Sequence, residues 1–164
     1  MQPKHHLLIG TAATAVLLPA IGPVGGASFL VASVLLIDLD HYLDFLIHNR
    51  FRSFSVRKML LYHKHLFLRI KRPDFLGFDV FHTVEFLACM TGFSFWFDAP
   101  LLKAITAGMT LHFLSDLIYL KWIGAFSARA HSVVEYLIRK RSMTRRGIVL
   151  EQPYQEVLDL IKSA

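Results

Sequence analysis

The sequence predicts an all-α membrane protein: a polytopic bundle of about four transmembrane helices with a basic interfacial segment and a helical C-terminal tail. The 164 residues are 54% hydrophobic and only 18% charged, whereas soluble domains average roughly 45–50% apolar and 25% charged residues. The apolar residues gather in four stretches, and turn-forming residues join these stretches in pairs. Water is therefore not expected to be the solvent for the whole chain.

Four apolar stretches define the expected bundle, which we assign to residues 1–124. They cover residues 7–21, residues 27–37 with a continuation to 47, residues 86–97 and residues 101–120. The last stretch meets the criterion of about 20 apolar residues for one span. Prolines and glycines between positions 19 and 26 separate the first two stretches, and Asp98, Ala99 and Pro100 separate the last two. We therefore expect two helical hairpins.

A basic segment separates the hairpins, and a basic tail follows them. The segment, residues 49–79, alternates cations with phenylalanine and leucine, which is typical of a helix lying on an anionic lipid surface. The tail, residues 125–164, is expected to be a separate cytoplasmic unit with helices over 127–141 and 153–162.

The placement of positive charge predicts the orientation in the membrane. Four spans would put seventeen of the eighteen lysines and arginines on one side and only Lys103 on the other, and the positive-inside rule assigns the basic side to the cytoplasm. We expect an inner (plasma) membrane protein with both termini cytoplasmic, the lipid bilayer as partner and no nucleic acid. A cleaved signal peptide over the first stretch is disfavoured, because its glycine-rich turn leads directly into a second apolar run. A soluble domain with a nucleic-acid-binding surface is disfavoured too, because few polar residues interrupt the apolar runs.

Ionisable residues inside the apolar stretches form pairs at helical spacing. Such groups cost about 2.5–3.5 kcal/mol at membrane depth, so each needs a partner or a purpose. Residues three or four positions apart share one helix face, and the pairs are Asp38 with His41, His82 with Glu85, and His112 with Asp116. One imidazole and one carboxylate from each helix is a donor set suited to a divalent metal ion, with zinc or manganese expected first.

The expected depth of these residues supports one shared site. At 1.5 Å per residue, Asp38 lies about 18 Å from the start of its helix, and His112 and Asp116 lie about 16 and 22 Å from the start of theirs. Both helices begin at non-cytoplasmic turns, so all three residues fall in the cytoplasmic half. His6 and His82 begin helices on that side. Hydrogen bonding between helices is the simpler explanation for one such pair, but convergence from four helices favours a metal site.

Four motifs in this order resemble those of the YdjM-like family of inner-membrane, metal-dependent hydrolases: HLLIG from His6, DLDH from Asp38, FHTVEF from Phe81 and GMTLHFLSD from Gly108. The resemblance covers about residues 4–121. It implies a metal and catalytic centre made of His6, Asp38, Asp40, His41, His82, His112 and Asp116. Ile37 replaces the family's proline, and the third motif lacks its upstream His-Arg, for which His63, His65 or Glu85 are the alternatives.

The expected function is metal-dependent hydrolysis at the cytoplasmic leaflet. The metal ligands are expected to be His6, Asp38, His41, His82, His112 and Asp116, with Asp40 or Glu85 as the general base. A basic collar beside the site favours an anionic lipid or phosphoester substrate. The alternatives are a metal or proton transporter that uses the same cluster, and a non-enzymatic membrane scaffold, which leaves the buried carboxylates without a role.

Overall fold

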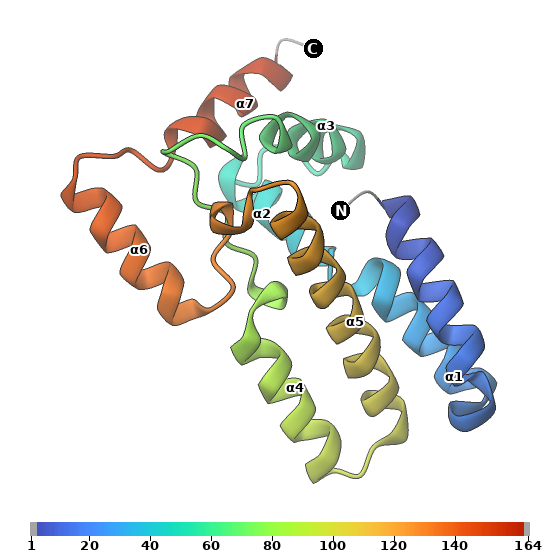
Figure 1. Cartoon of the computed structure of the whole chain (residues 1–164). Helices are drawn as coiled ribbons and strands as arrows, with labels where there is room; N and C mark the ends of the chain where they lie inside the picture. The colour runs from blue at the N-terminus through green and yellow to red at the C-terminus, as the bar shows by residue number, and fades with distance from the viewer. Residues whose placement is uncertain (1–2, 163–164) are drawn as a thin grey trace. The chain divides into compact units, whose positions relative to one another are not determined.

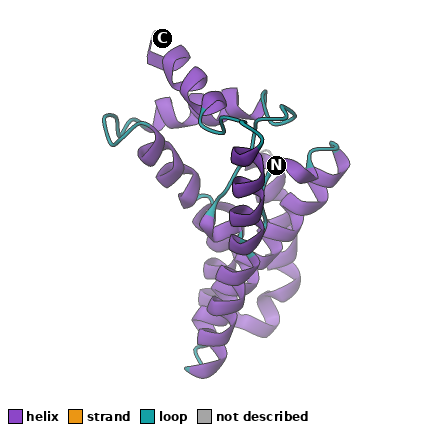
Figure 2. Ribbon diagram, turned by 90° about the vertical axis from the view of Figure 1, so that its left-hand side faces the viewer, coloured by secondary structure: helices purple, strands orange, loops and turns teal. Residues whose placement is uncertain are grey.

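The computed structural model describes residues 3–162, which form helices joined by loops, with no β-strand among them (Figures 1 and 2). The predicted all-α class is confirmed. The chain divides into two compact units: unit 1 is Met1–Asp38 with Phe81–Phe126, and unit 2 is Leu39–Val80 with Ser127–Ala164. The tail after residue 126 therefore belongs with the basic segment, whereas the sequence had suggested a unit of its own from residue 125.

The first hairpin of unit 1 is made by α1, Pro3–Val31, which is interrupted at Gly22. Gly22 has φ 68° and ψ 174°, a backbone conformation that glycine adopts without strain. The two arms on either side of this break pack closely: a Cβ on Gly10 would lie 2.5 Å from Ser33 Oγ, and one on Gly26 would lie 2.7 Å from Leu18 Cδ1. The expected turn and hairpin are confirmed.

A π-helix, η1, follows α1 over Ala32–Leu36. π-Helices are rare and occur mostly as single turns inside α-helices, often at functional sites. The chain then turns at Ile37 and Asp38 before α2 begins at Leu39. The second apolar helix expected from the sequence is therefore interrupted by a turn at Ile37 and Asp38, within a helical segment that continues to His48.

The second hairpin consists of α4, Val84–Trp96, and α5, Pro100–Trp122. The hydroxyl of Thr83 caps α4 by accepting a hydrogen bond from Phe86 N, and Pro100 occupies the first turn of α5, where its missing N–H is tolerated. Figure 1 shows α5 lying beside both arms of α1 and antiparallel to α4. The helices approach closely at Gly108, where a Cβ would lie only 2.4 Å from the carbonyl oxygen of Phe29.

Unit 1 exposes large apolar side chains around a small core. Its buried apolar cluster consists of Ala32, Ile37, Leu87, Met109 and Phe113. Two helical segments of the chain, Lys4–His48 and Pro100–Trp122, are long and apolar enough to cross a membrane, and α4 is apolar but shorter.

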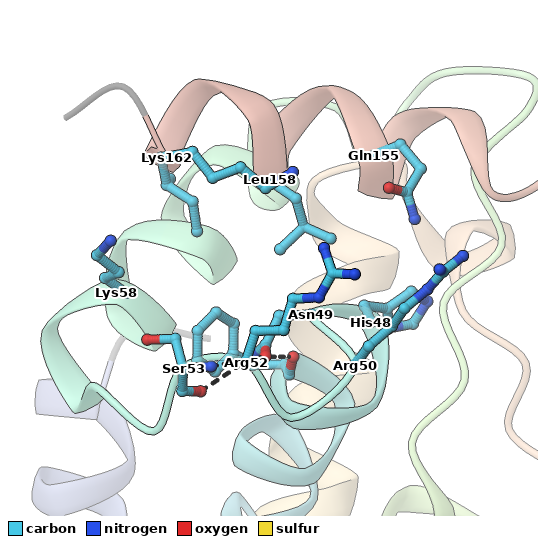
Figure 3. A pocket seen from close by; sticks show the side chains of 11 residues that line it. His48, Asn49, Arg50, Arg52, Ser53, Lys58, Gln155, Leu158 and Lys162 are labelled. Carbon is cyan, nitrogen blue, oxygen red and sulfur yellow. Dashed lines mark hydrogen bonds between the residues drawn. The ribbon is translucent and has the colours of Figure 1, made fainter.

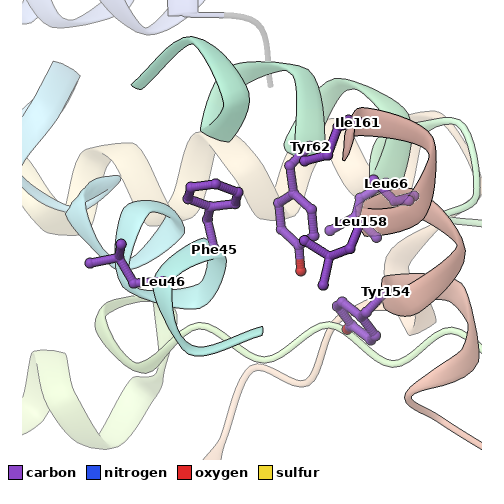
Figure 4. Packing of buried hydrophobic residues seen from close by; sticks show 8 residues of the cluster. Phe45, Leu46, Tyr62, Leu66, Tyr154, Leu158 and Ile161 are labelled. Atoms are coloured by element: carbon purple, nitrogen blue, oxygen red, sulfur yellow. The ribbon is translucent and has the colours of Figure 1, made fainter. Parts of the chain in front are cut away.

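Unit 2 contains α2, Leu39–His48; α3, Val56–Phe67; α6, Val133–Arg145; and α7, Gln152–Lys162. Its core lies between α2, α3 and α7 (Figure 4), and Phe45, Tyr62 and Val157 are completely buried there. The helix expected over 153–162 is confirmed. The helix expected from residue 127 begins later, because Ser132 caps α6 by accepting a hydrogen bond from Glu135 N.

Candidate metal centre

Five of the predicted ligands meet inside unit 1. They come from four separate segments: His6 from the first arm of α1, Asp38 from the turn after η1, His82 from the short helix η2 (Val80–His82), and His112 with Asp116 from α5. Four of the five are buried, and Asp38 is half-buried. The side chains of these five residues thus come together within this unit.

The imidazole nitrogens of the cluster face the carboxylate oxygens. His6 Nε2 lies 3.2 Å from Asp116 Oδ1. His112 Nε2 lies 3.4 Å from Asp38 Oδ1 and 3.9 Å from Asp116 Oδ2. His82 Nε2 lies 3.7 Å from the same Asp38 oxygen and 3.7 Å from the same Asp116 oxygen. Three imidazoles thus converge on two carboxylates.

A backbone hydrogen bond fixes the orientation of His112. Its Nδ1 lies 2.9 Å from the carbonyl oxygen of Ser33, and because a carbonyl only accepts, Nδ1 carries the hydrogen. Nε2 is buried and has no hydrogen-bond partner among the described residues. In the neutral ring, its lone pair therefore points at carboxylate oxygens, an arrangement that a cation stabilises. Metal-binding histidines usually donate their second ring N–H to a carbonyl or carboxylate in this way.

The ring of His6 stacks on that of His112, with the centroids 3.6 Å apart and the planes 4° from parallel. The ring of His82 meets that of His112 nearly edge-on, with the centroids 5.4 Å apart and the planes at 72°. The His112 ring is therefore held between a stacked ring and an edge-on ring, in addition to its backbone hydrogen bond.

The spacing of the donor atoms fits a shared metal ion. Zinc–nitrogen and zinc–oxygen bonds are about 2.0–2.2 Å long, so two ligands of one tetrahedral ion lie about 3.4 Å apart. Among the described residues of unit 1, two groups of three side chains each have their donor atoms within 4.8 Å of one another: His6, His112 and Asp116, and Asp38, His82 and His112. Because both groups contain His112, they form one cluster. Its two carboxylates would balance the charge of a divalent ion.

The remaining predicted metal ligand, His41, and the predicted base Asp40 lie on α2 in unit 2. His41 Nδ1 lies 3.2 Å from Asp79 Oδ1 and 3.5 Å from Asp40 Oδ1. Asp79 also accepts an ion pair from Arg129 Nε at 3.0 Å. Asp79 and Arg129 are not among the site residues predicted from the sequence, where Asp79 is marked only as one carboxylate in the apolar run of residues 75–81.

Three other candidates have separate positions. Glu85 is half-buried in the first turn of α4 and belongs to none of the described donor groups. His63, in unit 2, lies with Nε2 2.7 Å from the carbonyl oxygen of His41. Burial, and then the nearby His41 ring, hold the pKa of His63 below its ordinary value. His65 is half-buried on α3, where its carbonyl oxygen accepts a hydrogen bond from Arg69.

Comparisons with models of known protein families, with curated proteins and with solved structures found no significant match. The site is therefore interpreted from its own geometry. Buried histidine and aspartate side chains of unit 1 could hold a metal ion, and the orientation of His112 fits that role.

Proposed function

We propose that this protein is a membrane-bound, metal-dependent hydrolase whose divalent ion is held by the five-residue cluster of unit 1. One observation carries the proposal: donors from four separate chain segments converge, with imidazole nitrogens 3.2–3.9 Å from carboxylate oxygens. The resemblance to the YdjM-like family supports it as well. Each of the four motifs behind that resemblance contributes at least one residue to the cluster.

The chemistry follows from the residues that would hold the ion. A bound divalent metal lowers the pKa of a coordinated water toward about 7 and polarises a carbonyl or phosphoryl oxygen. Asp38, 30% exposed at its side chain, is the most accessible of the five and marks the side from which a substrate can approach. A carboxylate outside the ligand set is needed as general base. Glu85 belongs to the same unit as the cluster, and Asp40 is the second candidate.

The outer surface of unit 1 supports insertion as four spans, formed by the two arms of α1, by α4 and by α5. Val16 is 79% exposed and Ile118 is 71% exposed. Apolar side chains exposed to this extent are more favourable in contact with lipid than with water. Trp96, 82% exposed, lies next to the turn that begins α5, and Trp122, 81% exposed, ends that helix. A helix of 23 residues is about 35 Å long, so the two tryptophans have the spacing of the aromatic belts at the two membrane surfaces.

The connections of the chain support a cytoplasmic opening for the cluster. The chain leaves unit 1 after Asp38 and returns at Phe81, and His82 lies within 3.7 Å of Asp38. The basic segment is therefore joined to unit 1 beside the cluster. By the positive-inside rule, this basic end is expected to lie in the cytoplasm, in an inner or plasma membrane protein. The positive charge of the basic segment favours an anionic lipid or phosphoester as the substrate.

Metal content tests the proposed centre. The full chain, expressed with added zinc or manganese and purified in detergent, should contain stoichiometric metal by elemental mass spectrometry. Asp38→Ala and His112→Ala should each lose it, because each removes a donor and leaves a buried site incomplete. Asp98→Ala is the matched control, since this exposed carboxylate pairs with Lys103 at the α4–α5 turn. Wild-type protein without metal, or equal metal in all four proteins, would refute the centre.

Activity then separates hydrolysis from transport. The metal-loaded protein is assayed against a panel of phosphoesters and phospholipids, and in parallel in liposomes for metal and proton flux. Hydrolysis that is lost in His112→Ala supports the enzyme. Flux without hydrolysis assigns the same cluster to a transporter.

The lone cysteine makes the topology directly testable. Cys89 lies exposed on α4, and Cys89→Ser provides a cysteine-free background. In that background, Ala99→Cys should react with an impermeant maleimide from outside the cell, whereas Arg146→Cys should react only in inverted vesicles. The reverse pattern, or labelling of both from one side, would overturn the proposed orientation.

A further inference from the structure

Unit 2 contains a cavity of about 510 Å³ between the end of α2, the loop that follows it and α7 (Figure 3). Polar residues supply most of its wall: His48, Asn49, Arg50, Arg52, Ser53, Lys58, Gln155 and Lys162. Phe45, Leu158 and Ile161 form the apolar floor. Among the residues that the structure describes, no Asp or Glu belongs to the lining, although the sequence contains twelve of them.

An unusual helix end presents the arginines of this cavity. Phe51 N donates to the carbonyl oxygen of Leu46 at 2.8 Å, and Arg50 N donates to that of Ile47 at 3.0 Å. This is the Schellman pattern, in which the residue at the position of Arg50 is usually glycine. Arg50 has φ 57° and Phe51 has φ 56°, and such strained positions for non-glycine residues are concentrated at ligand-binding sites.

The loop is held in this form from within. The Asn49 side chain donates to the carbonyl oxygens of Phe45 and Ser53, at 2.7 and 3.1 Å, and accepts from Ser53 N at 3.1 Å. Figure 3 shows Arg50 and Arg52 extending from this loop toward α7. The arginines are therefore positioned by a fixed backbone rather than by partners of their own.

The cations around the cavity differ in their pairing. Lys162 pairs with Asp159 at 2.8 Å, and His48 pairs with Asp44 at 2.9 Å. Arg50, Arg52 and Lys58 form no ion pair with any residue that the structure describes. Three unpaired positive charges thus line the cavity, and none of the described residues in its wall is acidic.

We propose that this cavity binds a phosphate group, through the guanidinium groups of Arg50 and Arg52 and the ammonium group of Lys58. Guanidinium groups match the oxygens of a phosphate with paired hydrogen bonds, and lysine adds a compact charge. The Ser53 hydroxyl and the Gln155 amide are neutral donors in the same wall. This site is separate from the proposed metal centre and does not depend on it.

Two sources can supply such a phosphate: the headgroup of an acidic phospholipid and a soluble phosphate ester. The side chains of Phe51 and Phe54, from the same loop, are 57% and 63% exposed, and Leu60 on α3 is 60% exposed. Such side chains insert readily into a membrane surface beside a bound headgroup. The experiment therefore includes both kinds of ligand.

Binding is measured on the full chain, purified in detergent, by the shift in thermal unfolding as ligand is added. The probes are glycerol phosphate, inorganic phosphate, short-chain phosphatidylglycerol and short-chain phosphatidylcholine. The main variant is Arg50→Gly, which places glycine at the positive φ and so cannot lose binding through strain at that position. Arg52→Gln with Lys58→Gln removes the other two charges, and Arg141→Gln with Arg145→Gln removes two exposed charges of α6 as the matched control.

We expect the wild-type protein to bind at least one of the three anionic probes more tightly than the zwitterionic phosphatidylcholine, with Arg50→Gly and the Arg52/Lys58 pair each weakening that binding at least about tenfold. The control pair should bind like wild type, and the metal content should be unchanged in all variants. Binding of phosphatidylglycerol alone identifies the lipid as the source, and binding of glycerol phosphate or inorganic phosphate identifies a soluble one. No binding by wild type, or equal loss in the control pair, would overturn the proposed site.

Discussion

Replacing Gly108 by alanine tests whether the bundle of unit 1 depends on one close helix contact. A Cβ at this position would lie 2.4 Å from the carbonyl oxygen of Phe29, 3.0 Å from Ala32 Cβ and 3.1 Å from Ser33 N. The first of these distances is about 1 Å shorter than a favourable contact. The obstacle is backbone, which cannot rotate away as a side chain can, so α5 must move outward.

Two opposing effects set the size of the change in stability. Alanine is favoured over glycine inside a helix by about 1 kcal/mol, whereas overpacking a well-filled contact costs about 1–3 kcal/mol. With a backbone oxygen as the obstacle, the cost falls at the upper end, so the net loss is about 1–2 kcal/mol. The movement also stretches the hydrogen bond from His112 Nδ1 to the carbonyl oxygen of Ser33. Loss of such an outer contact lowers metal affinity by about 10–100-fold.

Gly92 on α4 provides the matched control, because a Cβ there meets nothing within 4 Å. Gly92→Ala should unfold at the same temperature as wild type or slightly higher and should keep its metal. The assay is thermal unfolding of both variants in detergent, together with a metal titration. If Gly108→Ala unfolds no earlier than Gly92→Ala and binds metal equally well, the close packing of α5 against α1 is refuted.

Two further predictions concern unit 2. Hydrogen bonds from Arg72 hold the pKa values of Asp74 and Glu156 below their ordinary values. These carboxyls therefore contribute stability above about pH 4, which is lost as the pH falls through their lowered folded-state pKa values. Scanning unfolding of wild type and Arg72→Met against pH should show a difference at neutral pH that shrinks in acid, and a constant difference would contradict the assignment. Tyr154→Phe removes a buried hydrogen bond of 2.7 Å to the carbonyl oxygen of Leu76. The free energy of unfolding should fall by about 1–3 kcal/mol. An unchanged denaturation curve would count against this hydrogen bond.

The sequence predicted the turns of unit 1 because their causes are local. Gly22 and the residues Asp98 to Pro100 interrupt apolar runs with residues that end helices, whatever surrounds them. The packing of the tail with the basic segment was not predicted. It depends on the fit of Phe45 and Tyr62 against Val157, and no spacing within the chain reveals which distant apolar face another will cover.

The candidate site was predicted in part, and the helical pairs show why. His112 and Asp116 lie on the uninterrupted α5, so the rule that residues four apart share a face applies to them. Asp38 and His41 are separated by the start of α2, because the chain turns at residues 37–38. The assumption behind their pairing therefore fails. The helical spacing rule does not apply to His82 and Glu85 either, because the extended cap residue Thr83 stands between them.

The π-helix at Ala32–Leu36 gives one peptide unit unusual influence over the site. This wide turn takes up one residue more than an ordinary α-helical turn. If the same residues were wound as an ordinary α-helix, every later residue of the segment would rotate by about 100° around the helix axis, which would carry the Asp38 carboxylate away from His112. The hydropathy profile would hardly change. The winding of this single turn therefore sets the direction of the Asp38 side chain, and two chains of equal hydropathy can differ at this cluster through that turn alone.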